Sequence, residues 1–136
     1  MKAYLMIVTL LYSSVLLAES KMDKVIVHDK YCSSPEQTMD EVYEHGAITN
    51  CIYAGFSITD AYKKYVDEHD EAYLEKVIKV NNNAQKEYPN DAVSVDYNWE
   101  NPKKLIIEQQ FAGGFTEMLL EEDQKGTKIT ITGHPD

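Results

Sequence analysis

The sequence contains no arginine: its 13 basic residues are all lysine, against 23 aspartates and glutamates, and the net charge is −10 at pH 7. Proteins that bind a phosphate backbone rely on clustered cations, which release counterions on binding. Arginine also supplies the forked donor that recognises carboxylates and phosphates. The composition therefore argues against nucleic acids, nucleotides and anionic membrane surfaces as ligands. A basic protein partner remains compatible, because acidic surfaces steer cationic partners.

Motifs of catalysis and metal binding are also missing from the sequence. It has no GxSxG elbow, no Walker motif and no dinucleotide-binding glycine pattern. The histidines His28, His45, His69 and His134 form neither an i, i+4 pair nor an HExxH group. The acidic residues 67–71 lack the glycine and the spaced carboxylates of an EF-hand loop. We therefore predict a protein that is not an enzyme and that has no catalytic residues, no metal site and no cofactor.

The first 20 residues have the layout of a secretory signal peptide. Lys2 places a positive charge near the start, residues 3–17 are mainly apolar, and small residues, Ala18 and Ser20, precede a cleavage point. The apolar run is shorter than the roughly 20 residues that span a bilayer. An uncleaved anchor and a buried helix are the alternatives. We expect export to the periplasm, cleavage near Ser20, and residues 21–136 as the mature domain.

Cys32 and Cys51 are the two cysteines of the chain. Two cysteines in an exported protein usually pair, and closing a loop of about 20 residues contributes roughly 3 kcal/mol in the chain-entropy model. A catalytic thiol is the alternative, but no histidine-bearing motif accompanies either residue. We predict a disulfide between Cys32 and Cys51.

Helical spacing of apolar residues predicts an all-α fold, a small single-domain bundle of about four helices. Ser33, Ser34 and Pro35 have the pattern of a helix start, and Gly46 would end or bend that first helix. Residues 47–66 form the second helix, because their apolar side chains recur every three or four positions. Its Gly55 suggests close approach of another backbone.

The remaining segments complete this bundle. Residues 71–88 are predicted as a third helix, and Asn101 followed by Pro102 would start a fourth that continues to Phe111. Residues 25–27 fit a strand or a first helical turn. Residues 92–100 are irregular or briefly extended. Residues 127–132 alternate like a strand, which allows a short C-terminal hairpin or an extended tail.

Tyrosine is abundant, with eight between residues 21 and 136. It is common at protein interfaces because it combines a large rigid ring with a polar tip, although each tyrosine alone also fits the edge of a core. Tyr53, Tyr62 and Tyr65 lie near the acidic stretch in sequence. From charge and expected exposure, we predict a partner-binding surface composed of Tyr62, Tyr65, Asp67, Glu68, His69, Asp70 and Glu71.

Residues 46–61, GAITNCIYAGFSITDA, resemble the central helix of the Rap/Tai group, the periplasmic immunity proteins that neutralise amidase toxins of type VI secretion. The resemblance rests on Cys51, Tyr53, Gly55, the pair Asp60 and Ala61, and downstream on Tyr88, Pro89, Pro102, Leu105 and Phe111. It implies an all-helical homodimer that occludes the basic active-site cleft of a peptidoglycan amidase with a loop.

Three alternatives to the immunity function remain open at this point. One is a periplasmic acid-stress chaperone of the HdeA kind, which shares export, helices and two cysteines. A second is a secreted hydrolase that uses dispersed carboxylates, because acidic residues are too numerous for a catalytic pair to be ruled out. A third is a structural envelope protein without a tight soluble partner.

Overall fold

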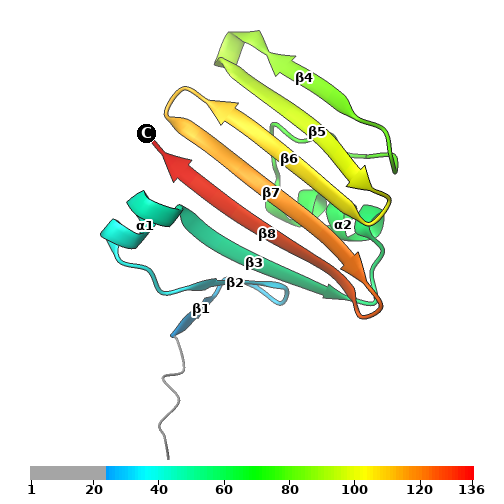
Figure 1. Ribbon diagram of the computed structural model, residues 1–136, viewed down its shortest axis with the longest axis horizontal. Coiled ribbons are helices and arrows are strands. Elements are labelled where there is room, and N and C mark those ends of the chain that lie inside the picture. The colour runs from blue at the N-terminus through cyan, green and yellow to red at the C-terminus, as the bar shows by residue number, and fades with distance from the viewer. Residues whose placement is uncertain (1–23) are drawn as a thin grey trace, which may run out of the picture.

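One antiparallel sheet of eight strands dominates the computed structural model, which describes residues 24–136. The predicted signal peptide, residues 1–20, lies outside the described residues. The strand order is β1-β2-β3-β8-β7-β6-β5-β4 (Figure 1). A search of residues 24–136 for a helix long and apolar enough to cross a membrane finds none.

The chain runs through the sheet as two parts. The strands are β1 (Val25–Val27), β2 (Cys32–Pro35), β3 (Ala47–Ala54), β4 (Ala84–Tyr88), β5 (Val93–Asn101), β6 (Lys104–Phe111), β7 (Gly114–Asp123) and β8 (Gly126–Pro135), with helices α1 (Met39–His45) and α2 (Ile58–His69) and a 3₁₀ turn (Pro89–Asp91). Strands β4 to β8 follow one another as a meander, and β3 pairs with β8. The segment from α2 to β4 therefore carries the chain from the β3 side of the sheet to its far edge.

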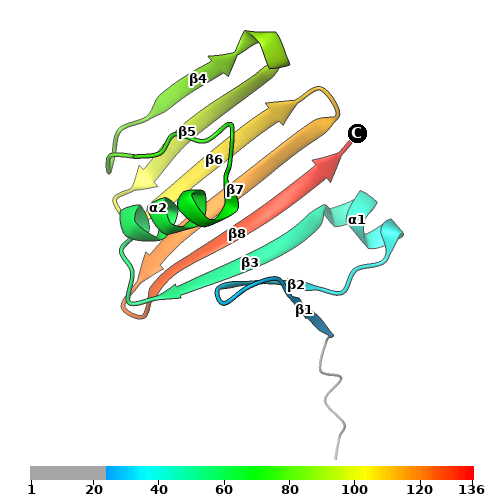
Figure 2. The same ribbon diagram turned by 180° about the vertical axis from the view of Figure 1, so that it is seen from behind.

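Helix α2 covers one face of the sheet, and the core lies between them (Figure 2). The helix begins where the Ser57 hydroxyl accepts a hydrogen bond from the backbone N–H of Asp60. Its buried side chains include Ile58, Tyr62 and Val66. The other face, which α2 leaves uncovered, is called the open face below. Helix α1 lies at the end of β3 (Figure 1).

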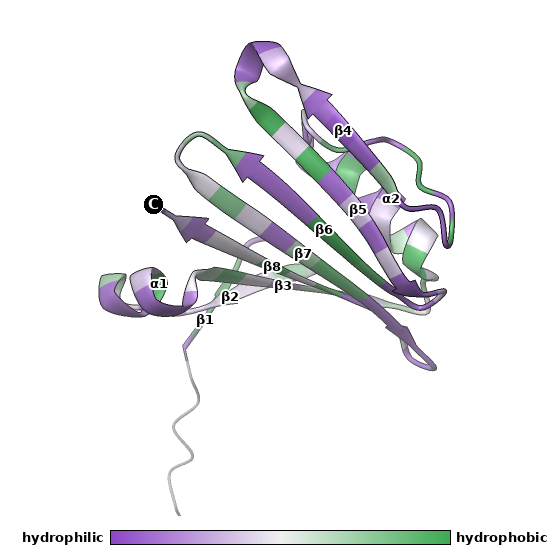
Figure 3. Ribbon diagram, turned by 45° about the horizontal axis from the view of Figure 1, so that its top comes forward, coloured by the Kyte–Doolittle hydropathy of each residue, from purple (hydrophilic) through white to green (hydrophobic). Residues whose placement is uncertain are grey.

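Alternation along the strands decides which side chains enter this core. In β5, every second residue from Val93 to Trp99 is buried, whereas the residues between them are exposed or half-buried. The same alternation appears in β6 and β7 and is visible as alternating colours in Figure 3. Each of these three strands therefore contributes one row to the core and one mixed row to the open face.

The predicted disulfide between Cys32 and Cys51 is present and joins two directly paired residues of β2 and β3. Both cysteines are buried, at 1% and 0% exposure. The bond ties the short β1–β2 hairpin to the rest of the sheet.

The prediction of an all-α bundle of four helices is wrong. Residues 47–66, expected to form one helix, divide into β3, a turn and most of α2. The apolar residues of 47–54 fit helical spacing and strand alternation equally well, and pairing with β8 favours the strand. Gly55 lies in the turn with φ of 79°, and no atom lies within 4 Å of the position its Cβ would take. It is needed there for its backbone conformation and not for close packing.

The other expected helices are also corrected. Ser33, Ser34 and Pro35 belong to β2, and the first helix begins later, where Thr38 and Glu41 form a capping box. Residues 71–83 form no helix, and residues 84–88 form β4. Asn101 ends β5, residues 102 and 103 form the hairpin turn, and residues 104–111 form β6. Asn101 followed by Pro102 indicates a turn as readily as a helix start, and the Asn101 side chain accepts a hydrogen bond from the backbone N–H of Lys103.

Two local predictions are confirmed. Gly46 ends the first helix, where its N–H donates to the carbonyl of Val42. Residues 127–132 belong to a strand, β8, which is longer than expected and central to the sheet. The segment 25–27, left undecided between strand and helix, is strand β1.

Ile107 and Ile106 are neighbours on β6 whose side chains face opposite sides of the sheet. Ile107 is fully buried in the core, so Ile107→Ala should lower the free energy of unfolding by about 2–5 kcal/mol. Ile106 lies half-buried on the open face, and Ile106→Ala should cost clearly less. Urea denaturation of both variants measures the difference, and equal losses would contradict the assignment of the two faces.

Candidate functional site

The predicted acidic binding segment, residues 67–71, lies at the C-terminal end of α2. Asp67, Glu68 and His69 belong to its last turn, Asp70 caps the helix in the left-handed conformation, and Glu71 follows in the loop. The structure brings these residues together, and two of the four acids among them are paired with lysines of the same helix.

Ion pairs along the helix neutralise the first two acids. Lys63 Nζ lies 2.7 Å from a carboxylate oxygen of Asp67, and Lys64 Nζ lies 2.9 Å from one of Glu68. The pairing with Glu68 raises the pKa of Lys64 above its ordinary value. These i, i+4 pairs compensate Asp67 and Glu68, whereas Asp70 and Glu71 take part in no ion pair found between residues 24 and 136.

Tyr62 and Tyr65 do not offer a contact surface. Their exposed fractions are 0% and 6%, because both side chains point from α2 into the core. The Tyr62 hydroxyl donates to the backbone carbonyl of Glu75, and the Tyr65 hydroxyl donates to the Glu71 carboxylate over 3.3 Å. Burial raises the pKa of both tyrosines. Their role as partner-binding residues stays a prediction that this burial disfavours, and Tyr53, at 0% exposure, is buried as well.

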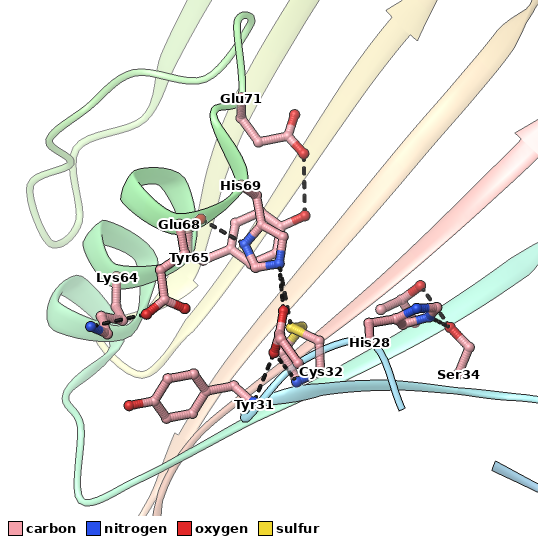
Figure 4. A network of polar contacts seen from close by, with 12 residues as sticks. His28, Tyr31, Cys32, Ser34, Lys64, Tyr65, Glu68, His69 and Glu71 are labelled. Atoms are coloured by element: carbon pink, nitrogen blue, oxygen red, sulfur yellow. Dashed lines mark hydrogen bonds and ion pairs between the residues drawn. A yellow bond between two sulfur atoms is a disulfide. The ribbon is translucent and has the colours of Figure 1, made fainter. Parts of the chain in front are cut away.

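His69 joins α2 to the turn between β1 and β2. Its Nε2 lies 3.1 Å from Asp29 Oδ2, and its Nδ1 lies 2.8 Å from the backbone carbonyl oxygen of Tyr65 (Figure 4). The imidazole also stacks on the Tyr65 ring, with centroids 4.2 Å apart. Sequence reasoning named His69 but missed Asp29, which lies 40 positions away.

Asp29 organises the turn that precedes the disulfide. Its Oδ1 accepts hydrogen bonds from the backbone N–H groups of Tyr31 and Cys32, each over 2.8 Å. These two hydrogen bonds, with a smaller contribution from His69, lower the pKa of Asp29 below its ordinary value. The turn, the disulfide and the end of α2 thus form one junction, with a cavity of about 400 Å³ beside it.

The open face carries three negative charges in directly opposite register positions. The register places Asp96 of β5 directly opposite Glu108 of β6, and Glu108 directly opposite Glu117 of β7. We call these three residues the acidic row. All three are half-buried, and none takes part in an ion pair found between residues 24 and 136. Like charges in directly opposite positions destabilise a sheet.

A second row on the same face shows the usual arrangement. Lys104 of β6 lies opposite Glu121 of β7, which lies opposite Lys128 of β8. Opposite charges alternate there, which stabilises strand pairing. The acidic row lacks that compensation, so its repulsion is a local cost that the fold tolerates.

Apolar and aromatic side chains lie on both sides of the acidic row. On one side, the register aligns Ile106 with Leu119. On the other side, the ring of Phe115 stacks on His134, with centroids 4.4 Å apart. The open face therefore combines apolar area with a strip of negative charge that has no ion-pair partner among residues 24–136.

Comparisons of the chain with protein-family models, curated proteins and solved structures find no match. The resemblance to the Rap/Tai group therefore stays a prediction. The expectation of an all-helical protein that came with it is corrected by the sheet.

Asp29 makes a testable contribution to acid stability. Because its pKa is lower in the folded protein, its charge stabilises the fold above the ordinary value of 3.8, and this contribution disappears as the pH falls through the lowered value. Asp29→Asn keeps an oxygen for the backbone N–H groups but removes the charge. Urea midpoints measured from about pH 6 down to about pH 2 should fall less steeply in this variant than in the wild type. The exposed Asp40→Asn is the control, and parallel profiles for the wild type and Asp29→Asn would contradict the assignment.

The acidic row predicts a stability change that needs no partner. Glu108→Gln removes the repulsion of this carboxylate with Asp96 and with Glu117. The free energy of unfolding should rise by roughly 0.2–1 kcal/mol at low salt, and by less at high salt. Glu121→Gln is the matched control, because Glu121 lies between two lysines and should show no gain. Thermal or urea unfolding of both variants tests this, and a gain for Glu121→Gln but not for Glu108→Gln would contradict it.

Proposed function

We propose that this protein is an exported, non-catalytic binding protein that covers a basic surface of a partner protein with its open face. The observation that carries the proposal is the acidic row, Asp96, Glu108 and Glu117. Three carboxylates in consecutive register positions lower the stability of the free sheet, and a cationic partner would turn that repulsion into attraction.

The size of the open face suits a protein partner. Strands lie about 4.8 Å apart and rise about 3.4 Å per residue, so five strands of eight residues cover roughly 650 Å². A standard protein interface buries about 800 Å² on each partner. The apolar pair Ile106 and Leu119 would supply the central contact, and the acidic row would set orientation and the rate of association.

The negative charge of the open face disfavours a second copy of this chain as its partner. Two copies of this chain placed open face to open face would bring two acidic rows together, and each chain carries a net charge of −10. Long-range repulsion disfavours that arrangement. The predicted homodimer, if it forms, would therefore use another surface, and the partner of the open face is cationic.

The amidase toxin remains the partner that the family resemblance predicts. A basic active-site cleft is compatible with the acidic row, but the resemblance implied a helical protein acting through a loop, whereas this proposal uses a sheet face. The chaperone alternative rested on export, helices and two cysteines, and the sheet removes only the helical part of that likeness. Export rests on residues 1–20 and is supported by the disulfide, since disulfides persist in oxidising compartments.

Capture from the envelope extract of the source organism tests the proposed surface. The bait is the mature protein, compared with the triple variant Asp96→Asn, Glu108→Gln, Glu117→Gln. A control triple variant, Asp60→Asn, Asp67→Asn, Glu68→Gln, removes the same charge from α2, which covers the opposite face. We expect a basic protein to bind the wild type and the control, with at least about tenfold weaker binding to the acidic-row variant at low salt.

Mass spectrometry of the captured protein then addresses the predicted partner. If the captured protein is a peptidoglycan amidase, the immunity role is supported. If it is a different basic protein, the proposed binding surface is supported and the immunity role is contradicted. Equal capture by all three baits would contradict the proposed surface. Hydrogen exchange of the backbone amides, measured with and without the purified partner, gives a second test. Protection that lies outside β5, β6 and β7 would also contradict the proposed surface.

A further inference from the structure

We propose that Asp29, Cys32 and His69 bind a Zn²⁺ ion when the disulfide between Cys32 and Cys51 is reduced, so that the disulfide and the metal are alternative occupants of one junction. This proposal is independent of the open face and of the function proposed above. Sequence spacing did not predict it, because Asp29 and Cys32 lie in a turn and His69 lies at the end of α2.

The three donor atoms already lie close together. Oδ2 of Asp29, Sγ of Cys32 and Nε2 of His69 all lie within 4.8 Å of one another. Nε2 lies 3.1 Å from Oδ2 and 3.9 Å from Sγ. In a tetrahedral zinc site with ordinary bond lengths, donor atoms are separated by roughly 3.2–3.6 Å. Small side-chain adjustments would therefore bring all three atoms to bonding distance.

Both the histidine and the aspartate are held as metal ligands usually are. A carbonyl oxygen only accepts hydrogen bonds, so Nδ1 of His69 donates to the carbonyl of Tyr65, and Nε2 points toward Asp29 and Cys32 (Figure 4). Oδ1 of Asp29 accepts from two backbone N–H groups, which leaves Oδ2 directed at His69. A ligating imidazole that donates its other N–H to a carbonyl is the common second-shell arrangement of protein metal sites.

Reduction supplies the third ligand. In the disulfide, Sγ of Cys32 is bonded to sulfur and is a poor donor. A small dithiol reduces the bond by exchange: two electrons and two protons pass to Cys32 and Cys51, which become thiols, and the dithiol becomes a disulfide. Zn²⁺ then displaces the Cys32 thiol proton and the proton that Nε2 of His69 shares with Asp29, and both protons pass to water. The ion binds the thiolate, the neutral imidazole and the carboxylate. The set of one sulfur, one nitrogen and one oxygen suits this borderline-soft ion.

The junction is open to an ion from solution. The cavity of about 400 Å³ is lined by all three proposed ligands together with His28, Thr49 and Tyr65. The side chains of His69 and Asp29 are 25% and 37% exposed, whereas Cys32 is 1% exposed. The ion would therefore enter from the side of His69 and Asp29 and meet the sulfur at the bottom of the site. Water or the Cys51 thiolate would complete the coordination.

Two cysteine variants separate the metal site from the loss of the disulfide. Neither Cys51→Ser nor Cys32→Ser can form the bond, but Cys51→Ser keeps the proposed sulfur ligand. Titration with Zn²⁺ alone, under nitrogen, should show one ion bound per chain of Cys51→Ser without added dithiol. Cys32→Ser should bind at least about 100-fold more weakly. Wild type should bind only after reduction, and reduced His69→Ala should lose binding where reduced His45→Ala retains it.

Co²⁺ provides a second readout on the same proteins, since a thiolate-to-cobalt charge-transfer band appears only when sulfur is bound. We expect that band for Cys51→Ser and not for Cys32→Ser. Equal Zn²⁺ affinity of these two variants, or of oxidised and reduced wild type, would overturn the proposal. Circular dichroism shows whether the cysteine variants fold. If they do not, the test is the Zn²⁺ affinity of reduced wild type compared with that of reduced His69→Ala. Equal affinities of these two proteins would overturn the proposal.

Discussion

The pairing of β3 with β8 is the constraint on which the rest of the structure depends. It joins the N-terminal hairpin, already bound to β3 by the disulfide, to the meander of β4 to β8. The register sets Cys51 opposite Ile129 and Tyr53 opposite Thr127, so these four side chains share the face that α2 covers. A shift of one residue would turn every buried side chain of β3 toward the open face. The core, the junction at Asp29 and the position of α2 all follow from this register.

Charge is distributed unequally over the two faces of this sheet. At the end of α2, lysines one helical turn away neutralise Asp67 and Glu68, and His69 pairs with Asp29. On the open face, the acidic row has no such compensation. Evenly compensated charge contributes to stability, whereas a strip of one sign makes a surface selective for the opposite sign. This difference is the reason why we propose the open face as the recognition surface.

The Asp29–His69 junction connects the fold to the redox state of its surroundings. The disulfide holds β2 to β3, and the ion pair holds the preceding turn to α2, so both act on the same few residues. In an oxidising compartment the disulfide fixes this junction, and in the reduced chain a metal ion would connect the same elements. The disulfide and the proposed metal site share residues because three groups meet at this junction: the sulfur of Cys32 in β2, the carboxylate of Asp29 in the preceding turn and the imidazole of His69 in α2.

The amino-acid sequence by itself determined the acidic character, the signal-peptide pattern, the cysteine pairing, the end of the first helix at Gly46 and the strand at residues 127–132. It did not determine the fold class, because short apolar runs such as residues 47–54 fit both the helical repeat and the strand repeat, and only pairing with a distant strand decides between them. The acidic row was invisible for the same reason: Asp96, Glu108 and Glu117 become neighbours through the register of three strands. Asp29 and His69 likewise meet only once α2 packs across the sheet. Contacts between residues far apart in the chain are set by tertiary pairing, which local spacing does not encode.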